Sequence, residues 1–389
     1  MKVMVAAPTF LPSHRANTIQ VMKMAQALQS IGHRVRVLVP GLTEGEKISW
    51  VNLASHYGLY ERLDIRWLPV KPRFRGYDYG YSVIRNFNQW VGDILYTRLP
   101  QAAAFASLLN IPTIFEVHDL PGGRAGTLLF SMFLKGRGAR RLVLISKSLR
   151  DEINQQFSPL PEAPFTLIAP DGVDLYRYKA IPTSIEARIL LKKGALPRLP
   201  VHAFTIGYTG NFYVGRGTKL ILELAQHLPD FSFLLVGGDP KDVQTIQTQV
   251  QELRLNNVFL TGFVHNSKLP EFQAACDVLL MPYQYTVAAS SGGNIAQYLS
   301  PMKLFEYLAC GRVILSSDLP VIREVLNERN AILLPPDDVS AWITALQQIC
   351  EDHTQQYLLA KQAREDSKRY TWKSRAEKIF SSGFSPLKS

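Results

Sequence analysis

The chain of 389 residues is long enough for two ordinary domains, and 47% of its residues are hydrophobic. This composition excludes a disordered chain, a collagen and a disulfide scaffold. Cys276, Cys310 and Cys350 form no C-x-x-C pair, so the sequence indicates neither a disulfide framework nor a cysteine zinc site. Because the first residues lack a signal-peptide pattern and no apolar stretch approaches about 20 residues, we expect a soluble, cytoplasmic protein.

The formal net charge of +11 lies in the first half of the chain. Residues 1–195 carry 25 Lys and Arg against 14 Asp and Glu, whereas residues 196–389 carry 18 of each. A one-sided basic field concentrates acidic partners such as phosphates or anionic lipids, although a solvated basic surface explains each single cluster equally well. Because the sequence contains no zinc finger and no aromatic RNP motif, we expect no nucleic-acid partner.

The first half predicts a doubly wound α/β domain. Residues 2–7 have the pattern of a buried strand, Asn17 is placed to cap a helix, and Gly32 is placed to end it before an alternating strand at 35–39. The helix has an apolar face made of Val21, Met24, Ala25 and Leu28. Later strands are expected at 93–97, 113–118, 141–145 and 166–169.

The second half repeats this pattern after a proline-rich and glycine-containing stretch at 181–200, which we interpret as a domain boundary. A strand at 203–208 is followed by a glycine-bearing loop at 209–217 and a helix. Further strands are expected at 231–236, 258–260, 278–281, 313–316 and 331–334. Two tandem α/β domains create a cleft between the carboxyl edges of two sheets, where ligands of such folds bind.

The loop at 209–217 has the features of a phosphate site. Gly210 and Asn211 follow the strand, and Arg216 stands directly before the helix, where free backbone N–H groups favour an anion. The spacing matches neither the dinucleotide fingerprint nor the P-loop, so the sequence favours neither a nicotinamide enzyme nor an ATPase. Glycine turns after strands also occur for structural reasons alone.

A second pattern lies at the start of a helix expected between Pro301 and Gly311. Lys303 and Glu306 are three residues apart and share one side, so the lysine could meet a diphosphate and the carboxylate could accept hydrogen bonds from ribose hydroxyls. The alternative is an ordinary Lys/Glu surface pair without a function.

His118 ends the expected strand at 113–118. A histidine at this position could donate a hydrogen bond to a ligand, and its ordinary pKa permits either protonation state near neutrality. The alternative is a capped or core histidine.

The motifs taken together resemble glycosyltransferase family 4, whose members are retaining enzymes with the two-domain GT-B fold. In the second half, the resemblance rests on Y-T-G-N-F-Y-V-G-R-G, F-L-L-V-G-G, F-L-T-G-F-V, D-V-L-L-M-P-Y, S-P-M-K-L-F-E-Y-L-A-C-G and S-D-L-P-V-I-R-E-V-L. The first half matches through E-V-H-D, L-I-S-K-S and P-D-G-V-D, and the last part through R-Y-T-W-K-S-R-A.

The resemblance implies two Rossmann-like domains facing a cleft. Residues 1–185 would form the acceptor-side domain, joined by a crossover helix at about 368–389, and residues 200–367 would bind the nucleotide-sugar donor. His118 would be the active-site histidine, and Ser13, Arg15 and Asn17 would lie on the acceptor side.

On the donor side, Glu306 resembles the second glutamate of the family's Glu-x7-Glu motif, whereas Tyr298 stands where the first glutamate belongs. The family's Arg-x4-Lys phosphate clamp maps onto Asn211 and Arg216, which leaves one cation in the loop; Lys303 would supply the second. The expected donor-binding residues are Gly210, Asn211, Arg216, Ser300, Lys303, Leu304 and Glu306.

The expected reaction is the retaining transfer of a hexose-type sugar from a UDP-sugar or GDP-sugar, with His118, Arg216 and Lys303 in catalytic roles. No Asp-x-Asp motif stands at a strand end, so we expect no metal ion and no other cofactor. The acceptor would be a glycolipid or a cell-surface polysaccharide intermediate. An anionic or lipid-linked acceptor and a peripheral contact with the inner face of a membrane would fit the basic first half. Two alternatives remain, a nucleotide-sugar epimerase of similar fold and a degenerate, non-catalytic nucleotide-binding homologue.

Overall fold

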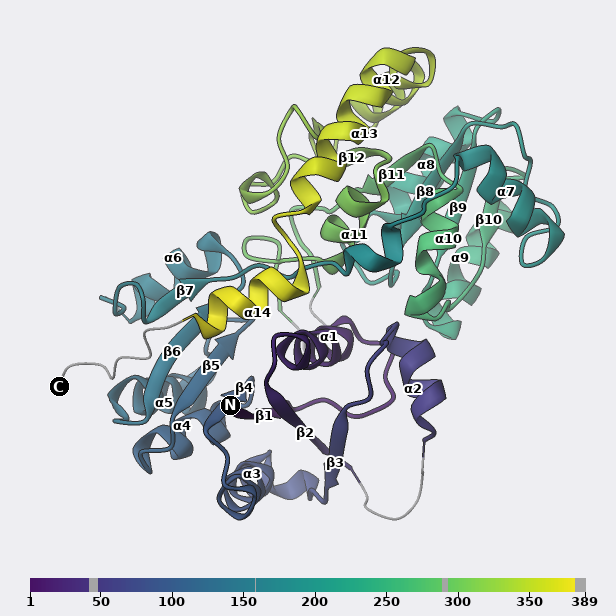
Figure 1. The fold of residues 1–389 in the computed structure, drawn as a ribbon. Helices are drawn as coiled ribbons and strands as arrows, with labels where there is room; N and C mark the ends of the chain where they lie inside the picture. The colour runs from purple at the N-terminus through teal and green to yellow at the C-terminus, as the bar shows by residue number, and fades with distance from the viewer. Residues whose placement is uncertain (42–47, 158, 289–292, 382–389) are drawn as a thin grey trace. The chain divides into compact units, whose positions relative to one another are not determined.

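The computed structural model describes residues 1–41, 48–157, 159–288 and 293–381 (Figure 1). The chain forms two compact units: unit 1 comprises Met1–Asp171 with Trp372–Ser389, and unit 2 comprises Gly172–Thr371. The division at residue 172 falls earlier than the sequence predicts, because Val173 and Tyr178 are buried in the hydrophobic core of unit 2. Residues 382–389 of the expected crossover lie outside the described residues.

Unit 1 contains a parallel sheet of seven strands in the order β3-β2-β1-β4-β5-β6-β7. The strands are β1 Lys2–Ala6, β2 Arg34–Pro40, β3 Asp64–Leu68, β4 Ile94–Thr97, β5 Thr113–Val117, β6 Ala139–Leu144 and β7 Thr166–Ile168. The helices are α1 Ala16–Ser30, α2 Trp50–Tyr57, η1 Pro72–Phe74, α3 Tyr77–Trp90, α4 Pro100–Leu108, α5 Gly123–Lys135, α6 Lys147–Gln156 and α14 Trp372–Phe380. This arrangement confirms the doubly wound domain, and the strand order reverses between β1 and β4.

Two details of unit 1 differ from the prediction. Helix α1 begins at Ala16 with Arg15 as its N-cap, not at Asn17, because the carbonyl of Arg15 already accepts from the N–H of Thr18 at 3.0 Å. Strand β3 was not predicted. It is an edge strand in which only Leu68 is fully buried, so its sequence lacks a continuous apolar pattern.

The last helix completes unit 1 although it lies more than 200 residues beyond the rest of this unit. In Figure 1, α14 lies in unit 1, and it packs against α1. Polar residues of α1 are buried as well: Gln20 donates a hydrogen bond to Glu116, and Nζ of Lys23 donates to the carbonyl of Gly58.

Unit 2 contains a parallel sheet of six strands in the order β10-β9-β8-β11-β12-β13, and this arrangement confirms the second α/β domain. The strands are β8 Thr205–Thr209, β9 Ser232–Val236, β10 Val258–Leu260, β11 Val278–Met281, β12 Val313–Ser317 and β13 Ile332–Leu334. The helices are η2 Leu175–Tyr178, α7 Ser184–Lys193, α8 Thr218–His227, α9 Pro240–Glu252, η3 Asn266–Lys268, α10 Leu269–Ala274, α11 Met302–Cys310, η4 Ile322–Glu324, α12 Val339–Glu351 and α13 His353–Ser367.

Helix α7 occupies the stretch that the sequence analysis interprets as a linker. Its start is a capping box, in which Thr183 and Glu186 satisfy each other's backbone N–H groups. Ala187 and Leu191 then face the core of unit 2. The prolines and glycine of this stretch lie around the helix and do not interrupt it.

None of the helices in the described ranges combines the length and the apolar character that a membrane crossing requires.

Close packing in β8 gives a first test of the structure. A Cβ on Gly207 would lie 2.2 Å from Sγ of the buried Cys276. We expect Gly207→Ala to lower the free energy of unfolding by about 1–3 kcal/mol, because the added methyl group overpacks the core. Adding Cys276→Gly to this variant should restore part of the loss. Chemical denaturation measures both. Gly194→Ala is the control, since no atom lies within 4 Å of the added Cβ; equal losses at positions 194 and 207 would contradict the packing of β8.

Candidate functional site

Parallel strands bring several of the predicted site residues to the carboxyl edge of each sheet. In unit 1, β4 and β5 are neighbours, so Arg98 and His118, which follow them, leave the same edge. In unit 2, β8 lies at the point where the strand order reverses, and the loop containing Gly210 follows it. Each unit therefore presents its own polar site.

The loop after β8 has a backbone that favours glycine. Gly210, Gly215 and Gly217 have φ values of 132°, 83° and 83°, which side-chain-bearing residues rarely adopt. Gly217 is the N-cap of α8, and no side chain caps this helix. The carbonyl of Asn211 accepts a hydrogen bond of 2.7 Å from the hydroxyl of Tyr208. The loop thus has the open backbone and the uncapped helix start that an anion site needs.

Lys303 lies in the first turn of α11 and points at this loop. A Cβ on Gly210 would stand 2.9 Å from Nζ of Lys303, so the ammonium group lies directly against this glycine. Nζ lies 3.6 Å from the ring centroid of Tyr208 and 5.6 Å from that of Tyr283. The guanidinium of Arg216 lies 5.1 Å from the same Tyr283 ring. The structure therefore brings Gly210, Arg216 and Lys303 together.

The ammonium group of Lys303 is buried and, among the described residues, has no hydrogen-bond partner. Burial, and then the positive charge of Arg216, hold the pKa of Lys303 well below its ordinary value. An anion between the two cations would remove both penalties, because it would supply an acceptor and an opposite charge.

Glu306 is buried on the same helix, and its carboxylate does not bond to Lys303. It accepts long hydrogen bonds of 3.4 Å from Nδ2 of Asn266 and Nε2 of Gln273, and Nη1 of Arg177 lies 3.9 Å from it. The interpretation of Lys303 and Glu306 as a surface pair is therefore wrong. The two side chains leave the same helix three residues apart, but Lys303 lies against Tyr208, whereas Glu306 lies against Asn266 and Gln273.

Arg177 and Asn266 were missed by the sequence analysis, since neither belongs to a motif of known spacing. Nε of Arg177 and Oδ1 of Asn266 are buried without a partner among the described residues. Native proteins rarely leave buried polar atoms unsatisfied, so these atoms, with Nζ of Lys303, mark a site that a polar ligand would complete.

Two other predicted donor residues have different surroundings. The side chain of Leu304 is buried in the hydrophobic core of unit 2, so only its backbone could meet a ligand. Ser300 precedes Pro301, which is the N-cap of α11, and no side chain caps this helix. Tyr298, at the position of the missing glutamate, is 5% exposed.

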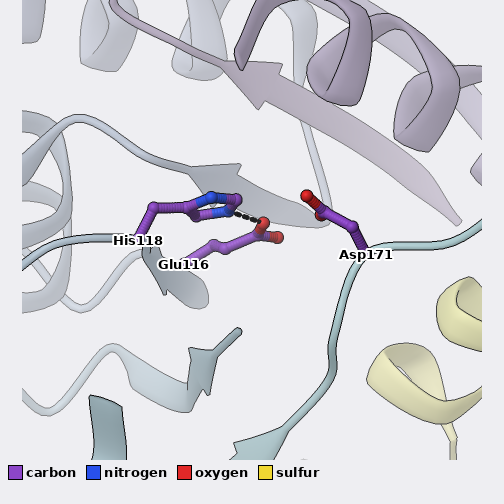
Figure 2. Close-up of side chains that lie close together, drawn as sticks. All are labelled: Glu116, His118 and Asp171. Carbon is purple, nitrogen blue, oxygen red and sulfur yellow. Dashed lines mark hydrogen bonds and ion pairs between the residues drawn. The ribbon is translucent and has the colours of Figure 1, made fainter. Parts of the chain in front are cut away.

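The site of unit 1 contains His118 directly after β5. Figure 2 shows its ring beside the carboxylate of Glu116, to which Nε2 of His118 is hydrogen bonded, with the carboxylate of Asp171 nearby. Nε2 of Gln20 also donates to Glu116, at 2.6 Å, and Nη2 of Arg375 does so at 2.9 Å. Glu116 and Arg375 form a buried ion pair, with side-chain exposures of 0% and 3%.

The charges around His118 control its protonation. Burial raises the pKa of Glu116, but the charges of Arg375 and His118 outweigh this effect and lower the pKa to about 2. Burial and the charge of Arg98 lower the pKa of His118 to about 4. The expectation that His118 takes either protonation state near neutrality is therefore wrong, because the imidazole is neutral there. Burial raises the pKa of Asp171 to about 7.

Glu116, His118 and Asp171 could be taken for a metal site, because one ligand atom of each lies within 4.8 Å of the others. The guanidinium of Arg375 already supplies the positive charge beside Glu116. Oε1 of Glu116 accepts from Gln20, His118 and Arg375, and Oε2 accepts from Arg375 at 3.2 Å. A cation at this place would have to displace a buried guanidinium.

The predicted acceptor-side residues lie around the start of α1. The backbone N–H of Ser13 donates to the hydroxyl of Tyr57 at 2.8 Å, and Arg15 is exposed at the N-cap. The carbonyl of Asn17 accepts from Nη1 of Arg98 at 3.3 Å. Arg98 also donates to Gln20, so Asn17 joins the network of His118. No such bond links Ser13 or Arg15 to that network within the described residues.

Comparisons with known proteins agree with this architecture. The family model described as "Glycosyltransferase Family 4" matches residues 18–177, and the model described as "Glycosyl transferases group 1" matches residues 203–352. Among solved structures, Anabaena HepE in complex with UDP has a TM-score of 0.74 and 16% identity, over 97% of this chain and 98% of that chain. Sucrose-phosphate synthase from Thermosynechococcus elongatus has a TM-score of 0.74 and 17% identity, over 97% of each chain.

The named relatives have higher sequence identity than these structures, but two of them align over only part of the chain. The 2-deoxystreptamine glucosyltransferase of Streptomyces kanamyceticus is 36% identical over 137 residues, which are 33% of each protein. The D-inositol 3-phosphate glycosyltransferase of Xylanimonas cellulosilytica is 26% identical over 53% of this chain and 48% of its own length. These matches span half or less of the relatives' lengths. The phosphatidyl-myo-inositol mannosyltransferase of Mycolicibacterium smegmatis is 22% identical over 90% of this chain and 85% of that protein.

The two parallel-sheet units define the class of the molecule as a GT-B protein. One family model matches mainly unit 1 and the other lies within unit 2, and the chain belongs to glycosyltransferase family 4.

The low pKa of His118 has a consequence for stability. Between pH 6.5 and pH 4 the unfolded chain binds a proton at this residue more readily than the folded chain, so the stability that neutral His118 contributes is complete above pH 6.5 and is lost as the pH falls. From pH 7 to pH 5, we expect the unfolding free energy to fall by about 1–2 kcal/mol less in His118→Gln than in the wild type. Urea denaturation at both values measures this, with the exposed His353→Gln as control; equal losses in all three proteins would contradict the assignment.

Proposed function

We propose that the protein transfers a hexose-type sugar from a UDP-sugar or GDP-sugar to an anionic or lipid-linked acceptor, with retention of the anomeric configuration. The observation that carries this proposal is the buried ammonium of Lys303, which lies against Gly210, shares the Tyr283 ring with Arg216 and has no acceptor within the described structure. A diphosphate supplies the missing acceptors and charge. The named relatives are glycosyltransferases, and HepE has been crystallised with UDP and with UDP-glucose.

In this proposal Glu306 binds the ribose. Its carboxylate is buried and its two amide hydrogen bonds are long, so vicinal hydroxyls can replace or shorten them. Arg216 and Lys303 stabilise the charge that develops on the departing diphosphate, which is the largest expected contribution to catalysis. Tyr298 is buried and stands at the position of the family's first glutamate, so no carboxylate is present there. In its place, backbone N–H groups at the uncapped start of α11 would contact the donor.

We also propose that the reaction needs no metal ion. Two protein cations, Arg216 and Lys303, are available for the diphosphate, and Arg375 neutralises the carboxylate beside His118. Neither proposed alternative is required by these observations. An epimerase would use acid and base groups in place of an acceptor, and the named relatives are transferases by name.

The donor site is tested by nucleotide binding. We expect UDP or GDP, but not NAD, to raise the melting temperature in the presence of EDTA, because ligand that binds only the folded state stabilises it. Lys303→Met and Glu306→Gln should each weaken nucleotide binding at least tenfold in calorimetry. Lys268→Met and Glu271→Gln are matched controls from an exposed ion pair of the same unit. Normal nucleotide binding in both site variants would overturn the assignment.

We place a peripheral membrane contact on unit 1. Unit 1 carries 24 Lys and Arg against 13 Asp and Glu, and unit 2 carries 19 of each. From η1 into α3, the cations Lys71, Arg73, Arg75 and Arg85 are exposed beside Phe74, Tyr77 and Tyr81, whose exposures are 43%, 42% and 68%. Cations attract anionic headgroups, and aromatic rings favour the interface between headgroups and acyl chains.

Vesicle binding tests this contact. We expect sedimentation with phosphatidylcholine vesicles that contain 30% phosphatidylglycerol and little with phosphatidylcholine alone. Because each basic residue contributes roughly 1 kcal/mol near an anionic surface, the double variant Arg73→Glu/Arg75→Glu should weaken binding at least tenfold. Lys192→Glu/Lys193→Glu makes the same charge change on the exposed face of α7 in unit 2. Equal binding to both kinds of vesicle would remove the membrane from the proposal.

A further inference from the structure

We infer that Arg375, on the last helix of the chain, is a positioning residue that acts through Glu116 to hold the ring of His118 in the tautomer with hydrogen on Nε2, so that Nδ1 accepts a hydrogen bond from a substrate hydroxyl. The inference rests on the proposed function for the substrate, but the geometry that carries it lies entirely within unit 1. In the sequence, Arg375 lies in the segment R-Y-T-W-K-S-R-A of the expected crossover helix, with no role predicted for its side chain.

Arg375 is fixed by contacts on every side of its guanidinium. Nε donates to the carbonyl of Pro170 at 2.9 Å, and Nη2 donates to the carbonyl of Ala169 at 3.1 Å. Nη2 and Nη1 donate to the two oxygens of Glu116 at 2.9 Å and 3.2 Å, and Nη1 lies 3.2 Å from the hydroxyl of Tyr96. This bidentate contact fixes the plane of the Glu116 carboxylate as well as its position.

The carboxylate in turn decides which nitrogen of His118 carries the hydrogen. Glu116 is ionised beside the guanidinium and can only accept, so Nε2 of His118 must be the donor in their short contact. A neutral ring with hydrogen on Nε2 has its lone pair on Nδ1. Nδ1 makes no hydrogen bond with the described residues, and 17% of the side chain is exposed.

The surrounding charges keep the ring neutral. Arg98 and Arg375 oppose a positive charge on His118, and Glu116 favours one; burial and the charge of Arg98 hold the pKa of His118 near 4. Asp171 is the other titratable group at this place, and burial raises its pKa to about 7. At neutral pH the ring therefore presents an acceptor, and a substrate hydroxyl is the complementary donor.

The same network reaches the acceptor side. Gln20 donates to Glu116, and its own oxygen accepts from Nη1 of Arg98 at 2.9 Å. Arg98 also donates to the carbonyl of Asn17 at the start of α1. A change at Arg375 therefore disturbs the group that orients His118 and, through Gln20, the segment proposed to meet the acceptor.

Arg375→Lys tests the inference, because it keeps the positive charge and loses the bidentate contact. We expect kcat to fall at least tenfold with the donor KM within twofold, while the UDP-induced rise in melting temperature persists. In nitrogen-15 spectra of the imidazole, the wild type should show hydrogen on Nε2, and the variant should show a mixture of tautomers. Glu116→Gln provides a second variant with the same expected spectral change.

Arg141→Lys is the matched control. Arg141 is also a buried arginine of unit 1, and it anchors α14 by donating to the carbonyl of Ile379, with no bond to Glu116. An equal loss of kcat in Arg141→Lys would assign the effect to anchoring of the helix and overturn the inference, as would a wild-type ring with hydrogen on Nδ1 or a tautomer unchanged in both test variants. If the wild type shows neither nucleotide binding nor turnover, the proposed function fails, whereas the spectra still decide the role of Arg375.

Discussion

The buried ion pair between Glu116 and Arg375 is the contact on which unit 1 depends. Two groups with almost no exposure to water are stable in the interior only if their hydrogen bonds are complete. Here the backbone carbonyls of Ala169 and Pro170, the hydroxyl of Tyr96 and the amide of Gln20 complete them. The pair joins β5 to α14, and it places an ionised carboxylate beside His118. One interaction thus closes the fold of unit 1 and sets the chemistry of its histidine.

The site of unit 2 has the opposite character. Its polar groups are brought together but not satisfied: Nζ of Lys303, Nε of Arg177 and Oδ1 of Asn266 are buried without partners among the described residues. Burying these groups costs free energy that contacts within the protein do not offset. A ligand that carries phosphate and hydroxyl groups would offset it, and part of the binding free energy would come from these new hydrogen bonds. The hydrogen bonds of the Glu116–Arg375 pair are thus made within unit 1, whereas the buried polar atoms of the site in unit 2 would gain partners from a ligand.

Local patterns predicted much of this structure. Both parallel sheets follow from buried strands that alternate with amphipathic helices, and the loop of Gly210 and the α11 pair of Lys303 and Glu306 follow from motif spacing. The burial of Glu306 and its separation from Lys303 could not be predicted, because spacing along a helix says nothing of what packs against it. Arg375 meets Glu116 across 259 positions of the chain, and no local pattern encodes such a partner. The capping box of α7, by contrast, could have been predicted from the spacing of Thr183 and Glu186, but the prolines around it favoured a linker.

The position of α14 after unit 2 in the sequence also sets an order for folding during synthesis. Domains generally fold as units as the chain emerges. The seven strands of unit 1 are made first, but Arg375 becomes available only after all of unit 2, Gly172–Thr371, has left the ribosome. Until then Glu116 is a carboxylate without its cation, and the face of α1 that α14 covers is open to water. During synthesis, unit 2 can therefore fold before the ion pair beside His118 is complete, and a chain interrupted between Thr371 and Arg375 would keep unit 2 and lack this pair.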